Sequence, residues 1–246
     1  MDRKKSKLGS FLKKLYRKYR ERHFRRYRGM SVQEVFSSIY KENVWGGEKG
    51  TFYSGSGTAN PKTAEYIKMM TGFINSHNIR SVAEIGCGDF SIMHQVLQQV
   101  DVQYTGMDVV PDLIAHHLEK NANAKTQFLV KDAISEPLPK ADLLIIRQVL
   151  QHLKNNQITQ ILQKLDNFKY AIITEHLPVT EDVEYNLDKV TGPHIRMRMN
   201  SGVFIDQPPF SLPNVSVLME YREDDPVKKK MVPAVMRSYL VTIKQS

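Results

Sequence analysis

Short apolar runs alternate with amphipathic segments along the chain from residue 81 to residue 174. Short apolar runs bounded by turn residues are typical of buried strands, and apolar residues spaced three and four positions apart are typical of helices. The predicted strands cover residues 82–85, 103–107, 126–130, 142–147 and 170–174, and the predicted helices cover residues 92–99, 111–120 and 157–165. Strands that alternate with helices form parallel sheets whose two faces are covered by the helices.

Two further strand-like runs, residues 215–221 and 234–243, close the sequence, and the turn-rich stretch "EDDPVKKK" joins them. Strands joined by a short turn pair antiparallel. We therefore predict an α/β fold with a doubly wound, mostly parallel sheet of seven strands, an antiparallel last strand and an N-terminal helical extension. This sheet domain is expected to span residues 81–246.

Residues 29–80 predict a helical region outside the sheet. Its first helix begins at Ser31, and Glu34 three residues later completes a capping box. A Gly/Ser-rich loop follows, and a second helix begins near Pro61.

Residues 177–213 form a long stretch that is rich in proline and glycine and only weakly periodic. Loops of this length in a compact domain are usually functional or disordered. We expect this stretch to form the wall of a substrate site.

The net charge of +9 is concentrated at the N-terminus. Residues 1–28 carry 13 lysines and arginines against two acidic residues, whereas the rest of the chain has 22 basic and 24 acidic residues. Apolar residues also recur along the tail at helical spacing, namely Leu8, Phe11, Leu12, Leu15, Tyr16 and Tyr19. A basic amphipathic helix suits an anionic membrane surface. Packing of this stripe on the domain or on a partner stays open, and nucleic acid is the weakest of the three alternatives.

Other bulk features favour a cytoplasmic location. The sequence has no apolar stretch long enough to span a membrane, and the charged N-terminus lacks the apolar core of a secretory signal. Its one cysteine, Cys87, excludes an internal disulfide and fits a reducing compartment.

The stretch "SVAEIGCGDFS" carries the most specific chemical signal. No lysine follows its glycines, as a phosphate-binding P-loop requires, and Ser91 stands where a dinucleotide fingerprint has its third glycine. The remaining pattern, E-x-G-x-G after a buried strand, resembles the first motif of class I S-adenosylmethionine (SAM)-dependent methyltransferases. That resemblance implies a Rossmann-like domain that binds SAM.

The ends of the next strands support this resemblance. Asp108 ends the second strand and can accept hydrogen bonds from both ribose hydroxyls, and Asp132 after the third strand can accept from the adenine amino group. Further segments, "VFSSIYKENVWGG", "YSGSGT" and "PPFSLP", look like those of small bacterial methyltransferases that accompany surface-glycan and lipid-linked saccharide biosynthesis. By this similarity residues 29–80 would act as a lid. The expected cofactor-binding residues are Glu84, Gly86, Cys87, Gly88, Asp108, Val109, Asp132, Ala133, Arg147 and Gln148, with Tyr40, Trp45 and Ser56 from the lid.

Methyl transfer to an oxygen or amine is assisted by a general base, most often histidine. His152 and His176 both follow predicted strands, and the sequence does not choose between them. Some relatives bind a metal through acidic residues where this chain has Gln148 and Gln151, so we expect no metal. The substrate-binding residues are expected among the polar side chains of the long loop, namely Asn186, Arg196 and Asn200.

These observations favour a SAM-dependent O-methyltransferase that acts on a saccharide or lipid-linked glycan. The basic tail would hold it at the inner face of the cytoplasmic membrane. Two alternatives stay open: a nucleic-acid methyltransferase that uses the tail to bind phosphate, and a methyltransferase fold retained as a non-catalytic scaffold. The sequence leaves the oligomeric state open.

Overall fold

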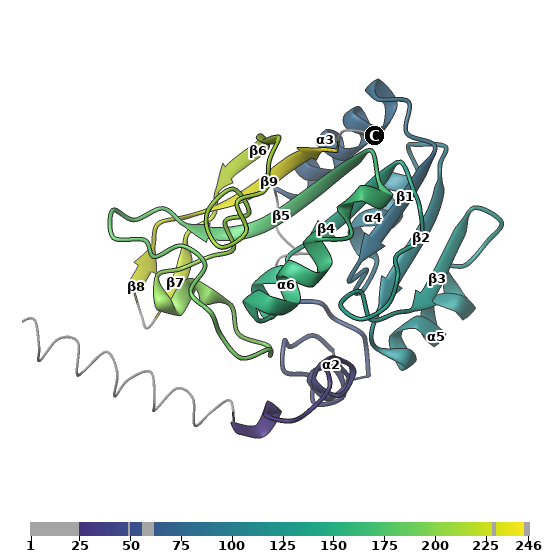
Figure 1. Cartoon of the computed structure of the whole chain (residues 1–246). Coiled ribbons are helices and arrows are strands. Elements are labelled where there is room, and N and C mark those ends of the chain that lie inside the picture. The colour runs from purple at the N-terminus through teal and green to yellow at the C-terminus, as the bar shows by residue number, and fades with distance from the viewer. Residues whose placement is uncertain (1–24, 49, 56–61, 228–229, 244–246) are drawn as a thin grey trace, which may run out of the picture.

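The computed structural model describes residues 25–48, 50–55, 62–227 and 230–243. Its centre is a seven-stranded sheet in the order β3-β2-β1-β4-β5-β9-β6, which confirms the predicted fold class (Figure 1). The strands are β1 (Ser81–Ile85), β2 (Gln103–Asp108), β3 (Thr126–Val130), β4 (Leu143–Arg147), β5 (Tyr170–Pro178), β6 (Val215–Arg222) and β9 (Ala234–Thr242). Strands β1 to β5 are parallel, and β9 runs antiparallel between β5 and β6.

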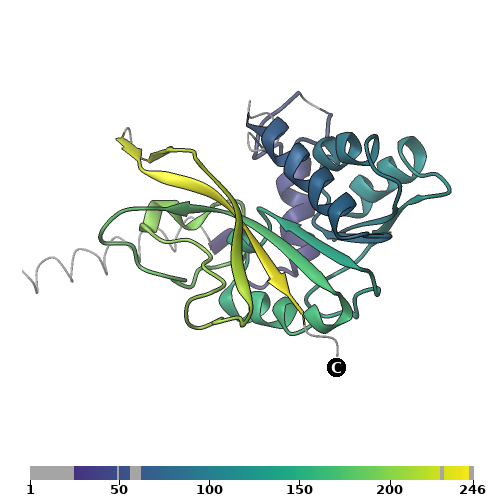
Figure 2. The ribbon, with the colours of Figure 1, turned by 90° about the horizontal axis from the view of Figure 1, so that it is seen from above.

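Helices cover both faces of this sheet (Figure 2). One face carries α3 (Thr63–Ser76), α4 (Ser91–Leu97) and α5 (Pro111–Lys120), which share a core with the apolar side chains of β1 and β4. The other face carries α6 (Asn155–Leu162), whose Ile158 and Ile161 are buried against the opposite side of the same strands. Because both faces are covered, the central strands are apolar throughout, which explains why their positions could be predicted.

Helix α2 (Val32–Lys41) begins at the predicted capping box. Glu34 N donates to Ser31 Oγ, and the Glu34 carboxylate accepts from Ser31 N. The helix lies beside the carboxyl ends of the central strands, where Phe36 packs against the α6 side of the core (Figure 1). The predicted basic helix in residues 1–28 and the proline at 61 fall, apart from residues 25–28, outside the described residues. Residues 25–27 form a short 3-10 helix, η1 (Arg25–Tyr27).

Two elements differ most from the sequence prediction, and the bounds of the other predicted strands and helices agree with the structure to within three residues. Strand β5 continues four residues beyond residue 174, because β9 pairs with it from Tyr170 to Pro178 and satisfies its backbone. The turn-rich stretch before β9 forms a small hairpin of β7 (Asp225–Val227) and β8 (Lys230–Val232). Polar residues ended the apolar pattern in both places. The partner of the β5 extension, β9, is distant in sequence, whereas β7 and β8 pair with each other.

Residues 179–213 form the long loop, and within it only η5 (Arg196–Met199) is helical. Three short 3-10 segments complete the chain's helical content among the described residues, namely η1, η3 (Leu150–His152) and η4 (Leu165–Asn167). No helix in the part of the chain that the structure describes is both long and apolar enough to cross a membrane.

Candidate active site

The turn after β1 is built around two glycines with positive φ, +68° at Gly86 and +53° at Gly88. A Cβ on Gly86 would lie 2.4 Å from Val149 Cγ2, and one on Gly88 would lie 2.4 Å from Ser54 Oγ. Side chains are therefore excluded by both conformation and space. The turn brings bare backbone to the floor of a cavity, where a ligand can approach it closely.

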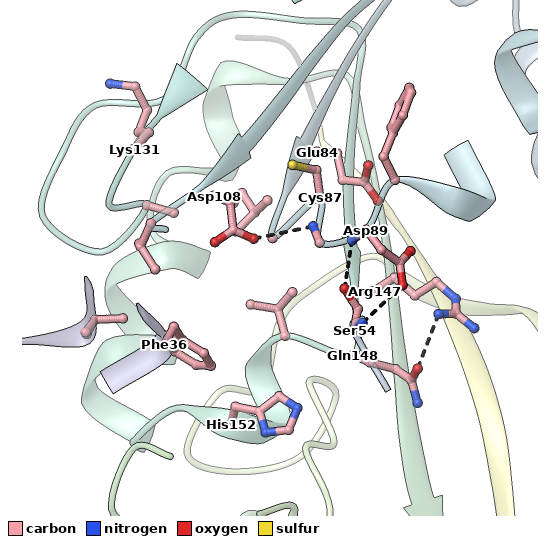
Figure 3. A pocket seen from close by; sticks show the side chains of 18 of the residues that line it. Phe36, Ser54, Glu84, Cys87, Asp89, Asp108, Lys131, Arg147, Gln148 and His152 are labelled. Atoms are coloured by element: carbon pink, nitrogen blue, oxygen red, sulfur yellow. Dashed lines mark hydrogen bonds between the residues drawn. The ribbon is translucent and has the colours of Figure 1, made fainter. Parts of the chain in front are cut away.

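Asp108 ends β2 beside this turn. One carboxylate oxygen accepts from Val110 N at 3.1 Å and the other from Gly88 N at 3.4 Å (Figure 3). Desolvation raises the pKa of Asp108 to about 6, and the backbone N–H groups oppose that rise. Each carboxylate oxygen has a second lone pair, so the side chain can still accept hydrogen bonds from a pair of hydroxyls.

Glu84 is the acid of the E-x-G-x-G motif, and it is 6% exposed. The Tyr104 hydroxyl donates to its carboxylate. Burial raises the pKa of Glu84 to about 8, while the hydrogen bond from Tyr104 and the nearby Arg147 lower it. Glu84 is thus both a structural partner of Tyr104 and a part of the cavity wall.

The loop after β3 forms a second wall. The Asp132 carboxylate accepts from Ile134 N at 2.9 Å and from Ser135 Oγ at 2.7 Å, which fixes the turn. Lys164, just after α6, donates at 2.7 Å to each of three carbonyls of this loop, those of Ala133, Ile134 and Glu136. Lys164 therefore fixes the shape of this loop without itself lining the cavity.

Ser54 of the predicted lid is joined to Asp89, which directly follows the turn of Gly86 and Gly88, by a reciprocal pair of hydrogen bonds. Ser54 N donates to the Asp89 carboxylate at 3.1 Å, and Asp89 N donates to Ser54 Oγ at 2.7 Å (Figure 3). The hydroxyls of Tyr40 and Ser54 are 3.0 Å apart, and the Tyr40 and Trp45 rings meet edge to face at 5.3 Å. Sequence reasoning missed Asp89, although an acid directly after G-x-G was a visible signal. The predicted lid residue Ser56 lies outside the described residues.

Two buried side chains, Glu175 and Arg196, hold the η3 turn after β4. On one side the Glu175 carboxylate accepts from Leu150 N at 3.0 Å and Gln151 N at 3.2 Å. On the other side Arg196 donates to the carbonyls of Leu150, Gln151 and Leu153. Glu175 is 0% and Arg196 is 1% exposed. Burial raises the pKa of Glu175, and Arg196 and the two N–H groups oppose that rise.

His152 lies at the end of this turn and faces the cavity (Figure 3). Its Nδ1 is 3.2 Å from the carbonyl oxygen of Gly192, which can only accept, so Nδ1 carries the proton and Nε2 has the free lone pair. Burial and the nearby Lys189 lower the pKa of His152 to about 3. The imidazole is therefore neutral at physiological pH, and it is flanked by the Trp45 ring at 5.4 Å.

His176, the other predicted base, does not line this cavity. It lies within β5 instead of after it, because the strand is longer than predicted. Its Nε2 is 2.7 Å from the Glu223 carbonyl, and its Nδ1 is 3.6 Å from the Asp225 carboxylate. The structure thus places His176 under the β7–β8 hairpin, 8% exposed, as a support for that hairpin.

The three side chains predicted to bind substrate are used within the protein. Arg196 clamps the η3 turn as described. Asn186 donates to the carbonyls of Phe204, Gln207 and Pro208 and accepts from Phe204 N. Asn200 is bound to Thr180 and to Asp182. The sequence predicted that these polar atoms bind a ligand. In the structure Asn186 and Asn200 instead bind groups of the long loop, and Arg196 binds the η3 turn.

The cavity at the carboxyl ends of β1, β2 and β4 contains about 990 Å³ of empty space, its open mouth included. All twelve of the predicted cofactor-binding residues that the structure describes line it, and the thirteenth, Ser56, lies outside the described residues. Val32, Phe36, Val149, Leu153 and Ile161 add an apolar side. Among the described residues, no three or more His, Cys, Asp or Glu side chains are grouped as a metal site.

These residues fit SAM on the geometry of the cavity itself. The glycine turn leaves a cradle that a Cβ would fill, Asp108 offers a carboxylate for a ribose, and the apolar side suits an adenine ring. Carboxylates with raised pKa values, Glu84 and Asp108, suit a ligand that carries positive charge.

Comparison with known proteins agrees with this site. A family model described as a methyltransferase domain matches residues 83–168. No curated protein sequence matches the chain.

Solved structures share the fold at low sequence identity. One is the N-methyltransferase NodS from Bradyrhizobium japonicum WM9 in complex with S-adenosyl-L-homocysteine (SAH), with 12% identity, a TM-score of 0.52 and coverage of 74% of this chain and 88% of that one. Another is magnesium protoporphyrin IX methyltransferase (ChlM) from Synechocystis PCC 6803 with bound SAH, with 11% identity, a TM-score of 0.51 and coverage of 86% and 100%. Likeness at this identity establishes the fold. The sequence prediction of a SAM-dependent methyltransferase is confirmed, since residues 83–168 match a methyltransferase domain and the fold around them is that of class I methyltransferases.

Proposed function

We propose that this methyltransferase transfers the methyl group of SAM to a hydroxyl oxygen of a saccharide or lipid-linked glycan. The observation that carries the proposal is one cavity that joins the glycine turn and Asp108 with the neutral His152. The choice of a saccharide is supported by the flanking segments, which resemble those of methyltransferases that accompany glycan biosynthesis.

When bound, SAM supplies an electrophilic methyl group. Asp108 would accept hydrogen bonds from the ribose hydroxyls, the Asp132–Ile134 loop would flank the adenine, and the glycine turn would approach the amino-acid part. Nε2 of His152 would accept the proton of the acceptor hydroxyl as the oxygen forms its bond to the methyl carbon and the sulfur–carbon bond breaks. Burial lowers the pKa of His152 to about 3, so its imidazole is uncharged and able to accept a proton throughout the physiological range, but the same low pKa makes it a weak base.

Titration calorimetry of the full-length protein with SAM and SAH tests the cofactor assignment. Both ligands are expected to bind wild-type protein with micromolar affinity, and NADH is expected not to bind. Asp108→Ala should abolish binding while the circular dichroism spectrum and melting temperature stay close to those of the wild type. A folded wild-type protein that binds neither ligand would favour the alternative of a non-catalytic scaffold.

We also propose that residues 1–28 attach the enzyme to an anionic membrane surface. The support is the sequence pattern of that tail, with 13 basic residues and an apolar stripe, against a body of near-neutral charge. Sedimentation with vesicles of anionic lipid, with vesicles of neutral lipid and with RNA compares the alternatives. Preferential binding to anionic vesicles that is lost when residues 1–28 are removed is the expected result. Stronger binding to RNA would instead indicate a nucleic-acid methyltransferase.

A further inference from the structure

The carboxyl ends of four neighbouring strands line the cofactor cavity in the order β3, β2, β1 and β4. Along this row Asp132 follows β3, Asp108 ends β2, Gly86 and Gly88 follow β1, and Arg147 ends β4. The proposed contacts of SAM begin at one end of the row, with the adenine at the loop after β3, the ribose at Asp108 and the amino-acid part at the glycine turn. The row continues past that turn to Arg147, so an extended ligand presents its amino-acid end to β4.

Arg147 lies on the α3 face of the sheet at this end of the row. Ile145, two residues earlier, belongs to the core on the α3 face, and side chains alternate along a strand, so Arg147 points the same way. Its guanidinium carbon is 5.1 Å from the centre of the Tyr66 ring, and its Nη1 donates to Gln148 Oε1 at 3.2 Å (Figure 3). These contacts fix a half-buried cation at the wall of the cavity.

Glu84 brings an acid to the same face. Strands β1 and β4 pair with Glu84 opposite Ile145, so Glu84 and Arg147 are diagonal neighbours at the edge of the cavity. Burial raises the pKa of Glu84 to about 8, and the charge of Arg147 is among the influences that lower it. An acid and a cation next to each other suit a zwitterion, and the amino-acid end of SAM carries one ammonium and one carboxylate.

Two side chains that carry a positive charge line the cavity in the part of the chain that the structure describes, Arg147 and Lys131. Lys131 follows β3, at the adenine end of the row, and its Nζ is 3.2 Å from the Glu136 carboxylate. The cation at the amino-acid end is therefore Arg147. Its planar guanidinium can also donate two parallel hydrogen bonds to a carboxylate, which an ammonium group cannot match.

We propose that Arg147 binds the carboxylate of the amino-acid part of SAM and makes the site selective for adenosyl ligands that carry this carboxylate. The inference rests on the cofactor part of the proposed function and is independent of the acceptor. It assigns a cation to a site whose other cofactor contacts are carboxylates, backbone and apolar side chains.

Titration calorimetry of the full-length protein with two ligands tests the inference. One ligand is SAH, and the other is S-adenosyl-3-thiopropylamine, which is SAH without its carboxylate. Wild-type protein should bind SAH about 10- to 100-fold more tightly than this amine analogue, because only SAH can make the charge-assisted contact. Arg147→Met should weaken SAH binding by about the same factor, whereas the analogue should bind as well as to wild type or better, since a repelling cation is gone. Arg147→Lys keeps the charge but not the planar fork, so its SAH affinity should fall between the two.

Lys131→Met is the matched control. It removes a cation from the adenine end of the same cavity, so it should change the affinities for both ligands by the same factor. Circular dichroism and melting temperature establish that each variant is folded. Equal losses of both ligands in Arg147→Met would mean that Arg147 only supports the fold, and equal wild-type affinity for both ligands would exclude a bound carboxylate. Either result would overturn the inference, whereas a wild-type protein that binds neither ligand would refute the cofactor assignment itself.

Discussion

The hydrogen bonds of the buried Arg196 to the η3 turn make a quantitative prediction for Arg196→Met. Arg196 donates five hydrogen bonds, three of them to carbonyls of residues 150–153, and it is 1% exposed. Methionine has similar length but no donor, so the buried carbonyls of Leu150, Gln151 and Leu153 lose their partner. Leaving a buried acceptor without a donor costs about 1–3 kcal/mol, so the loss at these three carbonyls should lower the unfolding free energy by about 3–5 kcal/mol. For a chain of this size that corresponds to a melting temperature lowered by about 6–20 °C.

Calorimetric melting of Arg196→Met beside Arg198→Met measures this effect. Arg198 lies two residues away on the same η5 helix and is exposed, so its variant should melt within about 2 °C of the wild type. The η3 turn carries His152, so Arg196→Met should also bind SAH more weakly, whereas Arg198→Met should not. If the two variants melted at the same temperature, the clamp would have no energetic role and the reasoning would be wrong.

Three further predictions concern the cofactor cavity. Gly88→Ala should weaken SAH binding at least about tenfold by calorimetry, because its Cβ would collide with Ser54 in a left-handed backbone conformation. SAH affinity should rise with pH as Asp108 ionises around its pKa of about 6, being about tenfold weaker at pH 5 than at pH 7, and Asp108→Asn should remove this dependence. An affinity that is flat over this range in the wild type would contradict the assigned role. His152→Asn can retain a donor to Gly192 and should keep SAH affinity while methyl transfer to the acceptor falls about 10²–10⁴-fold, and an unchanged rate would exclude His152 as the base.

The sheet could be predicted because its strands are buried on both faces. Residues 126–130 and 111–120 were predicted with the bounds that the structure shows, β3 and α5. The prediction failed where the structure depends on pairing with a distant segment. The last four residues of β5 include the polar Glu175 and His176, and only their pairing with β9 makes this stretch a strand.

The cofactor residues could be predicted for a related reason. The carboxyl ends of parallel strands meet at one edge of a sheet, so Glu84, Asp108, Asp132 and Arg147 had to lie near one another. The roles of Asn186 and Arg196 could not be predicted, because residue type does not distinguish a side chain that binds a ligand from one that binds backbone carbonyls. Arg196 contacts the η3 turn more than 40 residues away in sequence, and no local pattern announces such a contact.

At the end of β4 the chain passes from one face of the sheet to the other. Arg147 points to the α3 face, where its guanidinium lies over the Tyr66 ring, whereas the η3 turn packs on the α6 face, and Gln148 and Val149 join the strand to that turn. Gln148 has a φ of +55°, a conformation that costs a non-glycine residue about 1–3 kcal/mol and persists only where its surroundings impose it. Here Gln148 N donates to the Thr174 carbonyl, and the turn that follows is held between Glu175 and Arg196. Glu175 and Arg196 therefore do more than stabilise the fold: they hold the strained bend that takes the chain from the α3 side of the sheet, where Arg147 points, to the α6 side, where the η3 turn with His152 lies.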